Sequence, residues 1–251
     1  NEVDENYTIN KETEETFLWS SPTVSTSSIL YNTKLKTHQL LFGIDYVYQS
    51  YSSSNILDEN NIDTIAYSIF EENAIKNMSE TSIFILDNFK YYDIEFNLGT
   101  RLSYHLKYKS RISPSISLIK IINDYNYRFN FSKNYRIPSL KEMYYSYENH
   151  PGGFPVIGNE DLKLSTSNYY SLSIESRKYF NNSIEFYYND VSDMISNKFV
   201  KDENDSTVYQ YYNKDIVLYG FNINTFLQPL EKITLKSENI FFVTFTFIVF
   251  C

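Results

Sequence analysis

Few side chains in this sequence of 251 residues could carry covalent or metal chemistry. The three histidines, His38, His105 and His150, are far apart, and the single cysteine is Cys251 at the end of the chain. One cysteine excludes an intramolecular disulfide and any zinc site with three or four cysteine ligands, and the spread of the histidines argues against a histidine cage. The nucleophile elbow, the phosphate-binding glycine loop and the metalloprotease helix pattern are also missing, so we expect no enzyme.

The residues best suited to hold a ligand lie close together, between positions 144 and 150. Tyr144, Tyr145 and Tyr147 stand shortly before His150. Tyrosine rings stack on flat ligands, and imidazole is a common metal ligand. The alternative interpretation is an exposed loop histidine beside a turn, because Pro-Gly-Gly follows it directly.

The composition narrows the class of protein that must position these residues. Lys and Arg number 22 against 31 Asp and Glu, and this net charge of -9 argues against nucleic-acid binding. Gly and Pro number only 6 each, which excludes collagen-like and Pro/Gly-rich disordered chains. No apolar run is long enough for a transmembrane helix. The anomaly is the aromatic content, with 25 Tyr and 19 Phe but one Trp.

Alternation with a period of two dominates the hydrophobic pattern. Between Asp93 and Leu106 the even positions are apolar, aromatic or threonine, and the odd positions are polar, charged or glycine. Such alternation predicts a β-strand with one apolar and one polar face. Arg101 and Arg128 fall on the polar face, where they could attract an anionic ligand or form ion pairs with carboxylates. The predicted strands are roughly 23–34, 38–52, 78–90, 93–107, 110–122, 125–136, 163–176, 182–195, 210–227, 232–240 and the tail.

The lengths of these strands and of their connections point to a membrane protein. The alternating segments run to roughly 10–14 residues, whereas strands of soluble proteins average about 5–6. Long tilted strands, with short turns at one end and long loops at the other, are typical of an outer-membrane β-barrel. A soluble β-sandwich also alternates and stays open as the other fold. Tight turns are expected near 35–38, 90–93, 122–125, 177–182 and 228–232, and longer polar loops at 52–78, 138–162 and 197–210.

Two short motifs are more specific than the alternation. Residues 135–144 read Tyr-Arg-Ile-Pro-Ser-Leu-Lys-Glu-Met-Tyr, and residues 158–167 read Gly-Asn-Glu-Asp-Leu-Lys-Leu-Ser-Thr-Ser. Their order and spacing resemble two boxes in the barrel of TonB-dependent outer-membrane receptors. The first box matches except for Ile137 in place of Ala; in the second, Glu160 replaces Pro, and Leu-Ser at 164–165 replaces Pro-Glu. The motif residues are Arg136, Pro138, Leu140, Glu142, Gly158, Asn159 and Leu162.

A structural role explains these motif residues without invoking chemistry. Pro138 lacks a backbone donor and should end the preceding strand at Ile137. Arg136 stands where the strand leaves the sheet and could pair with Glu142. The Gly-Asn pair at 158–159 permits a turn before the chain returns. We therefore expect the two boxes to shape the base of a loop.

The resemblance implies a receptor of the bacterial outer membrane that takes up a ferric siderophore, haem or a cobalamin-type ligand. In this family the ligand binds outer loops and a plug, and a TonB-type energy-transducing complex pulls on the plug. The implied partners are outer-membrane lipid, that complex and the small-molecule ligand, with no resident cofactor and no nucleic acid. In haem-transporting members a histidine between the two boxes ligates the iron, so His150 is the candidate here. The tyrosines and lumen arginines suit an anionic ferric chelate.

The predicted strands amount to about half of the roughly 22 strands of such a barrel. We therefore expect an all-β fold, an antiparallel transmembrane β-barrel segment with the plug domain absent. Residues 1–251 are then a fragment of the receptor's barrel domain. Residues 1–16 are expected to be an acidic loop or frayed end, and residues 241–251 an atypical apolar tail. Two other functions stay open. One is a soluble or surface β-sandwich adhesin, and the other an outer-membrane enzyme using a Ser or Asp activated by His105 or His150.

Overall fold

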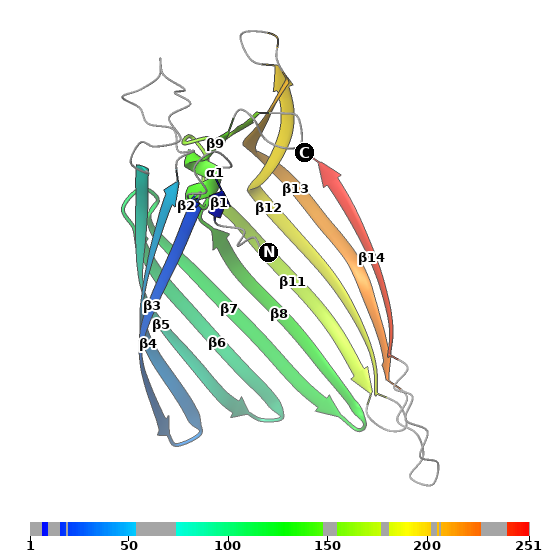
Figure 1. Ribbon diagram of the computed structural model, residues 1–251. Helices are drawn as coiled ribbons and strands as arrows, with labels where there is room; N and C mark the ends of the chain where they lie inside the picture. Colours follow the sequence, from blue (N-terminus) through cyan, green and yellow to red (C-terminus); the bar gives the residue numbers. More distant parts are fainter. Residues whose placement is uncertain are drawn as a thin grey trace.

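The largest part of the structure is a strongly curved, mostly antiparallel sheet, seen in Figure 1, in which tilted strands make an open, trough-shaped wall. The computed structural model describes residues 7–9, 16–18, 20–53, 74–147, 155–176, 181–201, 205, 207–226 and 240–250. Among them no helix is long and apolar enough to cross a membrane. The elements are β1 (Tyr7–Ile9), β2 (Thr16–Leu18), β3 (Ser20–Leu35), β4 (His38–Ser53), β5 (Ala74–Tyr91), β6 (Ile94–His105), β7 (Lys109–Ile122), β8 (Tyr125–Arg136), α1 (Leu140–Tyr144), β9 (Ser146–Tyr147), β10 (Val156–Ile157), β11 (Ser165–Ser176), β12 (Asn181–Lys201), β13 (Thr207–Phe226) and β14 (Ile240–Phe250).

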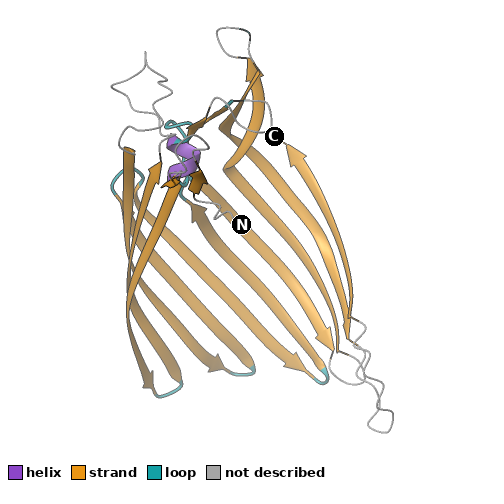
Figure 2. Ribbon diagram, viewed as in Figure 1, coloured by secondary structure: helices purple, strands orange, loops and turns teal. Residues whose placement is uncertain are grey.

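The strands of the wall follow one another in chain order. β3 to β8 are consecutive neighbours, β11 to β13 continue the sheet, and β14 pairs with β13, each with an antiparallel partner. The described strands leave β3 and β14 at the two borders, so they form part of a barrel rather than a closed one. Figure 2 shows how little else is present besides strands. The predicted all-β antiparallel barrel segment is confirmed.

The register explains which face of the wall meets lipid. Ile29, Ile44, Ile83, Leu102 and Ile112 are partners across five neighbouring strands, and each is at least 42% exposed. A continuous row of exposed aliphatic side chains is costly in water and favourable in a bilayer. The sandwich alternative would cover such a row with a second sheet, and no second sheet covers it among the described residues.

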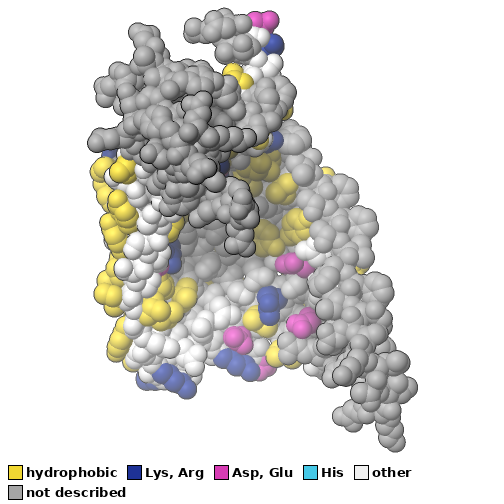
Figure 3. All heavy atoms as spheres, in the orientation of Figure 1, with side chains coloured by type: hydrophobic (Ala, Val, Ile, Leu, Met, Phe, Trp, Pro, Cys, Tyr) yellow, Lys and Arg dark blue, Asp and Glu magenta, His cyan; other side chains and the backbone are white. Residues whose placement is uncertain are grey.

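The opposite face of the same strands is polar. One residue further along each strand, Asp45, Ser82 and Ser103 form the neighbouring row, and the two serine hydroxyls are 2.7 Å apart. Figure 3, which looks into the trough, shows acidic and basic side chains close together on its lower concave surface. A strictly alternating sequence therefore produces an apolar convex face and a polar concave face.

The two ends of the wall differ in their connections. At one end, which we call the turn end, β3–β4, β5–β6 and β7–β8 are joined by two-residue turns, as expected. Lys36, Tyr92 and Asn123 open these turns with positive φ angles of 56°, 50° and 52°. At the other end, which we call the loop end, lie the β6–β7 turn at 106–108 and the helix α1. The expected turns near 177–182 and 228–232 lie largely outside the described residues.

Three segments differ from the expectation or extend beyond it. The loop expected at 197–210 is shorter, because β12 runs to Lys201 and β13 begins at Thr207. Polar residues had suggested a loop there, yet polar strands can extend beyond a membrane because backbone pairing does not require apolar side chains. Within 1–16, residues 7–9 form β1, which pairs with β2. Residues 240–250 of the apolar tail form β14.

Candidate functional site

The only helix among the described residues, α1, begins a loop that folds back over the loop end of the wall. We call residues 137–147 and 155–164 the outer loop. The buried Pro138 follows the end of β8, and Ser139 then caps α1 with extended backbone angles. The Ser139 hydroxyl accepts from the backbone N–H of Glu142 at 3.2 Å, and the Glu142 carboxylate accepts from the Ser139 N–H at 2.8 Å. This reciprocal capping box explains why serine and glutamate stand three residues apart.

Glu142 also anchors the end of β8. Its second carboxylate oxygen accepts a hydrogen bond from the guanidinium of Arg136 at 2.6 Å, which is the pairing expected from the sequence. The arginine side chain is 54% exposed, so the pair contributes at most about 1 kcal/mol to stability. Glu142 thus connects the strand, the helix cap and the helix, and its role here is structural.

The second motif docks against the back of α1. The backbone N–H of Gly158 donates to the Tyr145 carbonyl at 2.6 Å, and that of Asn159 donates to the Glu142 carbonyl at 2.9 Å. A Cβ added to Gly158 would stand 2.6–2.9 Å from backbone atoms of Met143 and Tyr144. Backbone cannot rotate away as a side chain can, so glycine is required here by close approach.

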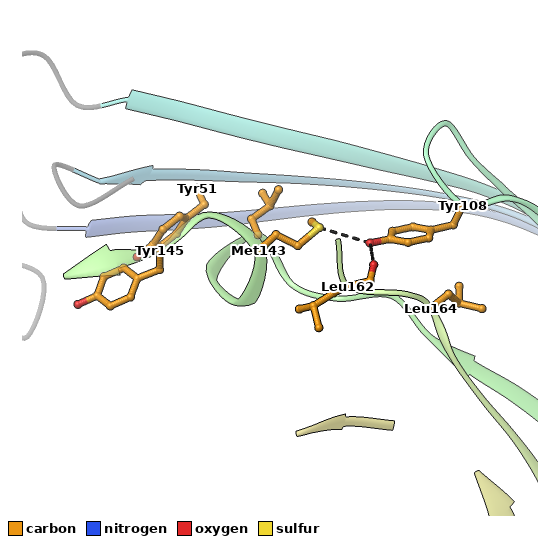
Figure 4. Packing of buried hydrophobic residues seen from close by; sticks show 7 residues of the cluster. Tyr51, Tyr108, Met143, Tyr145, Leu162 and Leu164 are labelled. Carbon is orange, nitrogen blue, oxygen red and sulfur yellow. Dashed lines mark hydrogen bonds between the residues drawn. The ribbon is translucent and has the colours of Figure 1, made fainter. Parts of the chain in front are cut away.

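A small hydrophobic cluster holds the two motifs together. Figure 4 shows Tyr108, from the turn between β6 and β7, pointing toward Met143 of α1 and Leu162 of the second motif. Its hydroxyl donates to the Leu162 carbonyl at 3.0 Å and lies 3.4 Å from the Met143 sulfur. Burial, aided by the nearby Tyr144 and Glu142, raises the pKa of Tyr108 to about 12. The phenol therefore stays protonated and able to donate throughout the physiological range. The cluster comprises Tyr51, Tyr108, Leu140, Met143, Tyr145, Leu162 and Leu164.

Sequence reasoning missed Tyr108, and it assigned His105 only a speculative part in catalysis. The His105 ring accepts backbone N–H groups of Lys107 at 3.1 Å and Tyr108 at 3.3 Å through Nδ1. The residue is 6% exposed, so this nitrogen is engaged in holding the turn and is poorly placed to activate a nucleophile. Nothing in a single sequence marks a turn tyrosine as the partner of a loop 35 to 54 residues away.

The candidate ligand residues of the outer loop fall into different environments. Tyr144 is half-buried, and the ammonium group of Lys76, from β5, lies 4.7 Å from its ring centroid. Tyr145 is 7% exposed and packs in the cluster, so in this structure its ring is a core element. Tyr147 is described only through its backbone, which pairs with Val156. His150 lies outside the described residues.

The two lumen arginines are placed on the concave wall. Arg101 forms an ion pair with Asp45 at 2.8 Å and lies over the ring of Phe84. Arg128 is exposed on β8, where its register partner is Ser173 of β11. The structure does not bring either arginine to the outer loop through any contact that its described residues show. Arg101 thus takes part in the ion pairing expected of a polar lumen.

A cavity of about 440 Å³ opens beside Arg101. Pairing of β7 with β8 stops at Ser115–Ser132, although both strands continue toward the loop end. Pro114, the next residue of β7, has no N–H to continue the ladder. Beyond this point the Tyr135 hydroxyl of β8 donates to the Glu80 carboxylate of β5 at 2.9 Å. No cluster of three or more His, Cys, Asp or Glu suited to a metal ion occurs in the described part of the chain.

Comparison with known proteins connects this architecture to a family. Residues 3–247 match the family described as TonB dependent receptor-like, beta-barrel. A search of curated proteins found no match. Among solved structures, the chain is similar to the ferric enterobactin receptor PfeA of Pseudomonas aeruginosa, with 16% identity, a TM-score of 0.68, and 88% of this chain covering 35% of that one.

Two further solved structures share the fold. The siderophore receptor PirA of Pseudomonas aeruginosa is 16% identical with a TM-score of 0.68, and 92% of this chain covers 43% of that one. The FrpB iron transporter of Neisseria meningitidis is 14% identical with a TM-score of 0.63, and 92% of this chain covers 36% of that one. The chain thus spans less than half the length of each of these structures. From the match over nearly its whole length, the chain belongs to the TonB-dependent receptors of the bacterial outer membrane, within their β-barrel domain.

Proposed function

We propose that this chain is part of a receptor that takes up a ferric siderophore through the outer membrane. The observation that carries the proposal is the match of residues 3–247 to the receptor barrel family. The exposed aliphatic row on the convex face and the ion-paired polar concave face are the features that such a barrel needs. The similar structures named above include two siderophore receptors and an iron transporter, which supports iron as the cargo.

In this proposal the loop end of the wall faces the cell exterior and receives the ligand. Tyr144 and Tyr147 of the outer loop, and Arg101 and Arg128 of the lumen wall, are the candidate contacts. A plug inside the complete barrel would respond to a TonB-type complex, which makes uptake depend on energy. The ligand is cargo, so no resident cofactor is proposed.

Uptake by the full-length receptor tests the proposal. The receptor would be produced in a host without its own siderophore receptors, and cells would be supplied with radioactive iron as ferric enterobactin. We expect iron to accumulate above the empty-vector control, and a protonophore to abolish the accumulation. Three ferric siderophores would be supplied in turn: a catecholate, a hydroxamate and a mixed type. If the cells accumulated no iron above the control from all three, the proposal would be contradicted.

Haem is the second candidate cargo, because His150 stands between the two motifs among tyrosines. Imidazole is a normal axial ligand of haem iron. Haemin would be titrated into the purified full-length receptor, with His150→Ala as the variant and His38→Ala, at the turn end, as the matched control. A Soret shift that only His150→Ala weakens would support haem binding. A spectrum equal to that of free haemin would exclude it.

A further inference from the structure

The outer loop is attached to the wall on one side through the tip of the β6–β7 hairpin. The Tyr108 hydroxyl bonds the Leu162 carbonyl, and the ammonium group of Lys107 donates to the Glu160 carbonyl at 2.6 Å. His105 fixes the hairpin tip itself through its two backbone contacts. This side therefore presents two donors, set in a rigid turn, to carbonyl groups of the second motif.

A second set of bonds attaches the same loop to β13. The Asn213 side chain accepts from the N–H of Lys163 at 2.8 Å and donates to its carbonyl at 3.1 Å. Asn159 donates to the Tyr211 carbonyl at 2.9 Å, and the N–H of Tyr209 donates to the Pro155 carbonyl at 2.8 Å. β10 then pairs in parallel with β13, which makes this attachment an extension of the sheet.

Tyr108 and Asn213 hold one peptide group of the loop from two sides. The Tyr108 hydroxyl bonds the Leu162 carbonyl, and the Asn213 side chain bonds the N–H of the next residue, Lys163. The β6–β7 hairpin and β13 are not neighbours, because β8, β11 and β12 separate β7 from β13. Elsewhere in the same loop, α1 contacts β4 and β5, and β10 pairs with β13. A loop attached to several separate strands cannot swing about a hinge without breaking one of these attachments.

We propose that the outer loop is a fixed brace across the mouth of the trough, with Tyr108 and Asn213 as its positioning residues, and that ligand binding leaves it in place. Tyr144 is then presented in one orientation, backed by Lys76. A pre-organised contact surface binds more tightly because less conformational entropy is lost on binding. The part of this inference that concerns ligand rests on the proposed siderophore function, whereas the rigidity of the brace does not.

Distances between two spin labels test the brace directly. The labels would be placed at Asp161, exposed in the outer loop, and at Asn197, exposed on β12, in the full-length receptor with Cys251→Ser and no other cysteine. We expect one narrow distance distribution without ligand, and the same distribution with saturating ferric enterobactin. A broad or double distribution in the ligand-free receptor, or a shift of the peak on adding ligand, would overturn the proposal.

Variants of the positioning residues provide the second readout. Tyr108→Phe removes one hydroxyl. Asn213→Ala removes the two hydrogen bonds to Lys163 of the second attachment, and a third to the Asp193 carbonyl of β12. Each should broaden the distance distribution and weaken ferric enterobactin binding by roughly three- to ten-fold, with the maximal uptake rate unchanged. Tyr92→Phe, at the turn end, is the matched control and should change neither quantity.

The outcomes separate this inference from the proposed function. A receptor that binds no siderophore but keeps a narrow distribution, broadened by Tyr108→Phe, would refute the function and support the brace. A receptor that transports siderophore while Tyr108→Phe and Asn213→Ala leave the distribution unchanged would refute the brace alone.

Discussion

The wall and the outer loop of this protein are stabilised in contrasting ways. In the wall, each strand pairs with its neighbour along its length, and the side chains repeat two simple environments, lipid and polar lumen. In the outer loop, a few residues each make several particular contacts, as Glu142 does with both Arg136 and Ser139. Wall positions should therefore tolerate many residues of the right polarity, whereas loop positions should depend on individual atoms.

The largest effect is expected from Gly158→Val in the outer loop. Its side chain would overlap backbone of Met143 and Tyr144, which cannot move without breaking α1. We expect a loss of about 4 kcal/mol in the stability of the loop, seen as rapid proteolysis within 137–164 while the wall stays protected. Gly99→Ala is the matched wall control. There the added Cβ would crowd side-chain atoms of Ser115 and Leu86, while the nearest backbone atom, the Ile85 carbonyl oxygen, is 3.9 Å away. A cleavage pattern as severe as that of Gly158→Val would therefore contradict this comparison.

Lysine substitutions on the two faces of β8 test which face of the wall meets lipid. Phe129 has Leu118 and Leu172 as register partners on the apolar face, and the adjacent Asn130 lies on the polar face, bonded to Ser171. Phe129→Lys should cost roughly 2–4 kcal/mol at mid-membrane depth, and Asn130→Lys about 1 kcal/mol from the lost hydrogen bond. Refolding into lipid vesicles followed by urea titration would measure both. Equal costs would show that the faces are assigned wrongly.

The capping box allows a finer test of the loop. Glu142→Ala removes both the cap and the Arg136 pair, and should lower loop stability by about 1–2 kcal/mol. Glu142→Gln keeps a capping side chain and should cost only about 0.5 kcal/mol. Hydrogen exchange of the Ser139 and Glu142 amides would measure the change, with Asp161→Asn as an exposed control. If both Glu142 variants exchanged alike, the ion pair rather than the cap would be the dominant interaction.

The smallest effect is a pH dependence of the brace. The pKa of Tyr108 is about 12 in the folded protein, above the ordinary value of 10.0, because burial disfavours the phenolate. A raised pKa means that the neutral form favours folding, so its contribution is complete below pH 10 and declines as pH rises toward 12. Label mobility at Asp161 should therefore increase over that interval in the parent protein. A Tyr108→Phe receptor should lack this rise, and a rise of the same size in it would assign the effect to another group.

The sequence predicted the wall well because its signal is local. Alternation between Asp93 and Leu106 located β6 to within a residue or two, and the turns at 36–37, 92–93 and 123–124 fell where expected. Where polar and apolar residues lost that contrast, prediction weakened, as at the ends of β12 and β13. The three-residue strands β1 and β2 are too short for any periodicity to be detected.

The candidate site could be predicted only in part. The motifs at 135–144 and 158–167 marked the outer loop, and the Arg136–Glu142 contact followed from proximity along the chain. The burial of Tyr145 did not, because a tyrosine beside a helix end can face either the core or the solvent. The assignment of His150 as a ligand stays a prediction, since it lies outside the described residues.

From the sequence alone it follows that the chain consists of strands with one apolar and one polar face, because a two-residue period fixes both the strand and its faces. The length of the strands favoured a barrel over a sandwich. The sequence also indicates where a strand is interrupted, because Pro138 cannot donate to the ladder and ends the strand before it. The contacts by which Tyr108 and Asn213 hold the outer loop from two sides appear only in the three-dimensional arrangement of the strands. Those contacts join residues about 50 positions apart, and their formation depends on the curvature of the sheet, which no local pattern encodes.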